Sequence, residues 1–223
     1  MHIPDGFIDV PTSAAFVAAS AIAVAGAVKG AKKQLSEQSA PLAGLTAVFI
    51  FAVQMLNFPV AAGTSGHLIG AALATILVGP YAASLALAVV LIVQAFLFAD
   101  GGLTALGLNI FNMSVIAVWV SFIIFITLKK IFPKTKRWLI IATFISALIS
   151  VPASALGFVI QYAIGANASF SVSTVLSAMV GTHILIGIGE AIITSLTISA
   201  VLATRSDLVF GWDNKHKPLE LRS

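Results

Sequence analysis

The stretch YAASLALAVVLIVQAFLF, residues 81–98, contains 18 consecutive residues without a charged side chain. A helix of about 20 apolar residues crosses the hydrocarbon core of a bilayer, which is about 30 Å thick. The whole chain has this character, because 59% of its 223 residues are hydrophobic, only 9% are charged and the mean hydropathy is +1.07. About 25% of the residues of a soluble domain are charged. The composition therefore excludes a soluble enzyme, a disordered tail and a coiled coil.

Other apolar runs of similar length determine the fold class. Inside a bilayer every backbone polar group needs a partner within the protein, so only helices and closed barrels span it. Barrel strands alternate apolar and polar residues, whereas the runs here are unbroken. We therefore predict an all-α, polytopic membrane protein with seven transmembrane helices, at about residues 11–28, 41–58, 66–79, 81–98, 104–128, 138–163 and 174–203.

The basic residues predict the orientation of these helices. All 12 Lys and Arg residues fall in three clusters, at residues 29–33, 129–137 and 205–222. With seven spans the three clusters lie on one side, which the positive-inside rule makes cytoplasmic. The N-terminus is then outside, and residues 204–223 form a cytoplasmic tail. The net charge of +4 is thus a signal of topology and does not indicate a nucleic-acid partner.

The N-terminal residues form a candidate metal chelate. No basic segment precedes the first span, as a signal peptide would require, so we expect a free amine at Met1, outside the membrane. This amine, the amide nitrogen of His2 and the His2 imidazole can close a five-membered and a six-membered ring around one metal. A fourth nitrogen would complete a square plane, which is typical of Ni(II) or Cu(II). We expect His67, which follows a glycine-rich turn on the same side, to supply it.

Polar residues near the predicted membrane core form a second group of candidates. His183 lies about ten residues into the last span and Glu190 lies seven residues later on the same helix face. Ionisable groups inside a membrane indicate function by default, but a polar pair that holds the bundle together is the alternative. His216 lies in the polar tail and is expected to be solvated. Four further residues either hydrogen-bond a metal-bound imidazole or cap helices: Gln94, Asp100, Asn109 and Asn112.

Two other function classes are compatible with single features. The sequence Gly63-Thr64-Ser65-Gly66, together with His183, faintly resembles rhomboid intramembrane proteases, which need Ser and His within hydrogen-bond reach. A purely structural or partner-binding membrane protein is the third possibility. Cysteine is absent, which excludes thiolate metal sites. The sequence contains no Walker A motif, so we expect a protein that is not an enzyme and that takes its energy from a partner.

Small residues line one face of the first predicted helix. Ala15, Ala19, Ala23 and Ala27 recur at a spacing of four residues. In lipid, such a stripe allows two helices to approach closely. It serves either packing within the bundle or the docking of a partner membrane protein.

Four motifs resemble one known family, the CbiM/NikM proteins. The opening Met1-His2-Ile3-Pro4-Asp5-Gly6-Phe7 is similar to the start of these proteins, and the resemblance is specific because it must lie at residue 1. Further similarities lie at residues 63–70, 94–109 and 182–190. The resemblance extends over nearly the whole chain.

The resemblance implies a specific function and architecture. CbiM/NikM proteins are the substrate-binding (S) components of energy-coupling factor (ECF) transporters, which import Ni²⁺ or Co²⁺ into prokaryotic cells. It implies a seven-helix bundle at residues 1–203, in the inner or plasma membrane, with an external metal-binding segment at residues 1–10. The implied ligands are the Met1 amine, the His2 amide and imidazole nitrogens and the His67 imidazole. Residues that would support them are Gln94, Asp100, Asn109, His183 and Glu190.

The resemblance also implies partners. These are a transmembrane T component, two ATPase subunits and a small N component, which we expect to be a separate membrane subunit. Among the transported ions, the planar four-nitrogen arrangement favours nickel, and cobalt is the alternative.

Overall fold

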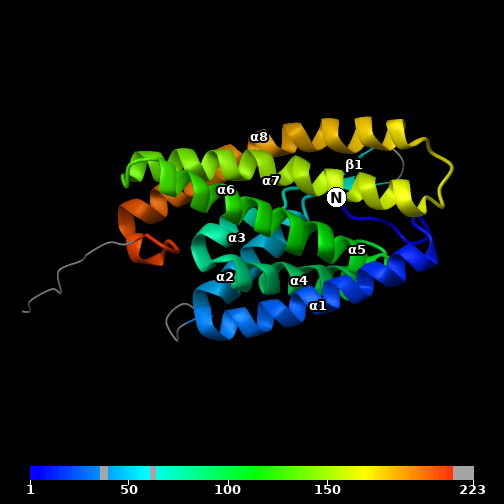
Figure 1. Ribbon diagram of the computed structural model, residues 1–223, viewed down its shortest axis with the longest axis horizontal. Coiled ribbons are helices and arrows are strands. Elements are labelled where there is room, and N and C mark those ends of the chain that lie inside the picture. Colours follow the sequence, from blue (N-terminus) through cyan, green and yellow to red (C-terminus); the bar gives the residue numbers. More distant parts are fainter. Residues whose placement is uncertain (36–39, 61–63, 213–223) are drawn as a thin grey trace, which may run out of the picture.

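The computed structural model describes residues 1–35, 40–60 and 64–212, which form an elongated helical bundle (Figure 1). The α-helices are α1 (Val10–Gln34), α2 (Ala40–Gln54), α3 (Ala71–Val78), α4 (Pro80–Phe98), α5 (Leu106–Ile110), α6 (Val118–Ile131), α7 (Lys136–Gly165) and α8 (Val172–Thr204). A π-helical segment, η2 (Phe111–Ala117), joins α5 to α6, and a short 3-10 helix, η3 (Ser206–Leu208), follows α8. His216 and most of the predicted tail lie outside the described residues.

The helical class predicted from the sequence is confirmed. Five of the helical runs have the length and composition to cross a membrane, namely Val10–Gln34, Pro80–Phe98, Leu106–Ile131, Lys136–Gly165 and Val172–Thr204. The other two predicted spans correspond to α2, with 15 residues, and α3, with only eight. The bundle therefore has five helices that can span a bilayer and two shorter apolar ones.

The predictions for residues 41–58 and 66–79 need correction at their ends. α2 ends at Gln54, and the chain then forms a two-stranded antiparallel ribbon from β1 (Phe58–Pro59) and β2 (Ser65–Gly66). α3 begins only at Ala71, because Gly70 has φ +76°, a left-handed conformation that stops a helix from extending backwards. This leaves residues 67–70 as a short irregular segment inside the bundle.

The surface is apolar, and the short helix α3 lies in the interior. Large aliphatic side chains such as Ile22 and Leu185 are more than 70% exposed, as expected for positions that contact lipid. At the centre, seven of the eight residues of α3 are buried, where the helix packs against α4, α6, α7 and α8. The segment before α3 is thereby fixed among the surrounding helices.

Residues 1–9 form an N-terminal arm that turns back into the bundle (Figure 1). The Asp9 carboxylate caps α1 by accepting a hydrogen bond from the Thr12 amide at 2.8 Å. Ile8 forms a β-bridge with Ala166 at the end of α7. Met1 is fully buried, so the segment predicted to be external has its first residues packed between helices.

Candidate metal centre

The N-terminal arm is held in place by hydrogen bonds to the residues that follow His2. Asn109, in α5, accepts a hydrogen bond from the Ile3 amide at 2.8 Å and donates one to the Ile3 carbonyl at 3.3 Å. The same carbonyl accepts a bond from the Gly102 amide at 2.9 Å. Further out, the Thr104 amide and hydroxyl donate to the Asp5 carboxylate at 2.7 and 2.6 Å. Asn109 therefore acts on the arm rather than on an imidazole.

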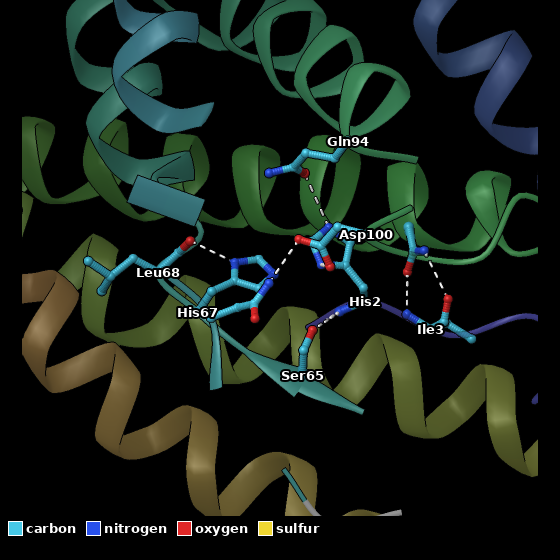
Figure 2. A network of polar contacts seen from close by, with 9 residues as sticks. His2, Ile3, Ser65, His67, Leu68, Gln94 and Asp100 are labelled. Carbon is cyan, nitrogen blue, oxygen red and sulfur yellow. Dashed lines mark hydrogen bonds and ion pairs between the residues drawn. The ribbon is translucent and has the colours of Figure 1, made fainter. Parts of the chain in front are cut away.

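The arm places His2 beside His67, as Figure 2 shows. The two imidazole rings are stacked, with centroids 4.6 Å apart and 28° between their planes. Gln94 Oε1 lies 3.2 Å from Nε2 of His2, and Asp100 Oδ1 lies 3.1 Å from its Nδ1. The structure thus brings together the two histidines and two of the polar residues that the sequence singled out.

The turn after α4 requires a glycine at position 101, where its backbone meets the His2 ring. Gly101 has φ +89°, and a Cβ atom there would lie 3.0 Å from Cδ2 of the His2 ring. A side chain would therefore be strained by the backbone conformation and would also push against the ring. The sequence interpretation placed Gly101 in a motif but gave it no role; its role is to let the backbone approach His2.

His67 is buried in one defined tautomer. Its Nδ1 lies 2.8 Å from the Leu68 carbonyl, and a carbonyl only accepts, so Nδ1 carries the proton. Nε2 is then an unprotonated acceptor, and it has no hydrogen-bond partner among the described residues. Unpartnered buried polar atoms are rare and call for an explanation. A neutral imidazole with a fixed Nδ1–H and a bare Nε2 is ready to bind a metal.

Side chains from two other helices hold the segment that carries His67. Glu190, in α8, accepts hydrogen bonds from the amides of Ile69 at 2.7 Å and Gly70 at 3.0 Å. Gln54, in α2, donates to the Ile69 carbonyl at 2.8 Å. Glu190 therefore caps the start of α3, where helical amides lack partners. No hydrogen bond pairs Glu190 with His183 among the described residues: Glu190 accepts from the two amides, and His183 Nδ1 donates to the Met179 carbonyl.

The surroundings of the N-terminal amine and of the His2 ring favour their neutral forms, which can donate a lone pair to a metal. Burial lowers the pKa of the Met1 amine well below its usual value, although the Asp100 carboxylate opposes this effect. Burial also lowers the pKa of the His2 imidazole, again against the influence of Asp100. A neutral amine and a neutral imidazole each have a lone pair available for a metal.

Asp100 keeps a negative charge next to these donors. Burial alone would raise the pKa of its carboxyl, but the contact with the His2 ring lowers it below the usual value. An open pocket of about 310 Å³ lies over His2 and is lined by the carboxylates of Asp5 and Asp100. A pocket with two carboxylates over the His2 ring attracts cations.

Side chains alone do not complete a metal site. Within the described ranges, no group of three or more His, Cys, Asp or Glu residues is arranged to hold a metal. Backbone nitrogens are further donors available to a site built on His2 and His67. The amine and amide nitrogens of the arm lie next to these rings.

The protease arrangement is not formed. Ser65 Oγ accepts a hydrogen bond from the His2 amide at 3.3 Å, whereas His183 Nδ1 donates to the Met179 carbonyl at 2.7 Å. No hydrogen bond joins Ser65 to His183 in the part of the chain that the structure describes. Ser65 is instead a neighbour of the arm. Asn112 is also absent from the site, because its amide donates to Gln161 at 2.7 Å.

Comparison with known proteins shows the family of the chain. Residues 2–208 match the CbiM family model, described as the cobalt uptake substrate-specific transmembrane region. The chain belongs to the CbiM family. Its relatives carry names from both nickel and cobalt transport, and the family is one of membrane transport components.

Individual relatives and one solved structure show how far the similarity extends. A protein of Haloquadratum walsbyi named for metal transport is 38% identical over 212 residues, 94% of each chain. The fused nickel transport protein NikMN of Rhodobacter capsulatus is 30% identical over 94% of this chain and 64% of its own length. A crystal structure of a truncated transition metal transporter is 31% identical, with a TM-score of 0.84 over 91% of this chain and 99% of that one. The CbiM-family fold and its role in nickel or cobalt transport are thus shown.

Proposed function

We propose that this CbiM-family protein is the substrate-binding component of an ECF transporter and binds Ni²⁺ through four nitrogens. The donors are the Met1 amine, the His2 amide, Nδ1 of His2 and Nε2 of His67. The observation that carries this proposal is the bare, buried Nε2 of His67 beside the stacked His2 ring. Four nitrogens in one plane suit Ni²⁺, whereas Co²⁺, the alternative cargo, gains less from a square plane.

Binding requires a rearrangement of protons around His2. The amide proton, for which Ser65 Oγ is the acceptor, has to be released to solvent. The ion replaces Asp100 at Nδ1, so the proton of the neutral ring sits on Nε2. Gln94 Oε1, 3.2 Å away, accepts that proton and fixes the ring in its metal-binding tautomer.

Replacing Gln94 by alanine is expected to lower nickel affinity by about 10–100-fold, the usual cost of losing a partner that orients a metal-bound imidazole. The matched control is Gln161→Ala, because Gln161 is equally buried but bonds Asn112 and not His2. Calorimetric titration of both purified proteins measures the difference. Equal affinities for the two variants would contradict the role assigned to Gln94.

Energy for import comes from partner subunits in this proposal. They are a transmembrane T component, two ATPase subunits and a separate N component in a prokaryotic cell membrane, with the N-terminus outside. The alanine stripe on α1 is exposed at Ala15, half-buried at Ala19 and Ala23, and buried at Ala27. Its N-terminal part is thus the part available for sliding against the T component.

Nickel uptake by whole cells tests this dependence on partners. Cells that lack other nickel importers are expected to accumulate radioactive nickel only when the chain is produced with its partner subunits. Inactivating the ATPase subunits should abolish the uptake. If the chain alone imports nickel at the same rate, the proposed role as a component of an ATP-driven importer is wrong.

A further inference from the structure

His183 is a buried histidine that the proposed four-nitrogen site does not use. Its side chain is fully buried in α8, and its Nδ1 donates to the Met179 carbonyl at 2.7 Å. Nε2 is therefore an unprotonated acceptor, and it has no hydrogen-bond partner among the described residues. His183 thus has the same tautomer and the same bare Nε2 as His67.

Contacts on either side of His183 place it opposite His67. The Thr64 hydroxyl donates to Met179 Sδ at 3.3 Å, and Glu190 bonds the Ile69 amide at 2.7 Å. Met179 and Glu190 lie four residues before and seven after His183, so all three share one helix face to within about 40°. The segment that faces this part of α8 runs from Thr64 to Ile69 and contains His67.

The chemistry of the two rings suits a shared metal ion. Two neutral imidazoles with bare Nε2 atoms in one buried region are suitable ligands for a late divalent transition metal. No other donor in the described structure satisfies either nitrogen.

We propose that His183 is a further metal ligand, which holds the ion together with His67 while the N-terminal chelate is open. This inference rests on the proposed function, because it assigns a second position to the same cargo. In the closed state the arm supplies three nitrogens and His67 the fourth. With the arm withdrawn, His67 retains the ion and His183 replaces part of the lost coordination, with water filling the other positions.

A variant without the His2 imidazole isolates this second position. His2→Ala protein, purified without a histidine tag, is expected to bind Co²⁺ saturably but more than about 100-fold more weakly than the wild type, since a direct ligand is lost. Adding His183→Asn should weaken this residual binding by at least about tenfold. Asparagine can still donate to the Met179 carbonyl but offers no counterpart of Nε2. The matched control, His2→Ala with His216→Asn, removes a tail histidine and should bind like His2→Ala.

The outcomes separate this inference from the proposed function. Tight binding by the wild type tests the N-terminal chelate, whereas the residual binding of His2→Ala tests His183. The inference is overturned if His2→Ala shows no saturable binding, or if His183→Asn leaves its residual binding unchanged. X-ray absorption spectroscopy of Co²⁺ bound to the His2→Ala protein is a second test. It leaves His183 unmutated. Two coordinated imidazoles are expected, and a single one would overturn the inference.

Discussion

Adding two residues before Met1 is expected to abolish tight nickel binding, with a loss of more than about 100-fold in affinity. Even a residue that only orients a metal ligand is worth about 10–100-fold, and the extension removes the amine from its five-membered ring with the His2 amide. It also cannot fit without displacing the arm, because Met1 is fully buried. Calorimetric titration of the extended and the unmodified protein measures the effect.

A C-terminal extension of the same two residues is the control for this experiment. It leaves the amine in place and should bind nickel as tightly as the unmodified protein. Thermal unfolding without metal shows whether the extended arm still packs into the bundle. An N-terminally extended protein that binds nickel with unchanged affinity would show that the amine is not a ligand.

Replacing His67 by alanine is the second change with a large expected effect, again more than about 100-fold in nickel affinity. The variant loses the Nε2 donor, and a direct ligand is worth more than the partners that orient it. The segment around it should stay folded, because Glu190 and Gln54 hold the backbone of Ile69. The hydrogen bond of the His67 ring goes instead to the Leu68 carbonyl. Affinity should therefore fall much further than stability.

His216→Ala is the matched control for His67→Ala, since it also removes one imidazole from the chain. Titration and thermal unfolding of both variants separate loss of a ligand from loss of the fold. Nickel affinity of His67→Ala within about threefold of the control would contradict its role as a ligand.

The sequence predicted the helical architecture because long apolar runs without charges can only be helices in lipid. It did not predict where α3 begins, since Leu68 and Ile69 continue the apolar run directly before Ala71. The left-handed conformation of Gly70 and the hydrogen bonds that Glu190 accepts from the Ile69 and Gly70 amides set that boundary, and both depend on tertiary structure. The spacing of apolar residues in the sequence predicts neither the conformation of Gly70 nor the contacts of Glu190.

The candidate site was predicted from the position of His2 and the glycines before His67. The burial of the arm was not, because Met1 to Pro4 form no regular element whose pattern could indicate contacts. Its position depends on Asn109 and on the backbone of Gly102, about a hundred residues away in sequence. The tautomer of His67 likewise depends on a single carbonyl contact. Such features follow only from the folded chain.

The most direct test of the four-nitrogen site is a titration of the purified, untagged protein with Ni²⁺ and Co²⁺, followed by calorimetry and optical absorption. The account predicts one Ni²⁺ bound per chain, more tightly than Co²⁺, with the absorption of a diamagnetic square-planar complex of four nitrogens. The absence of saturable nickel binding would contradict it. So would a bound Ni²⁺ with the spectrum of a paramagnetic six-coordinate ion.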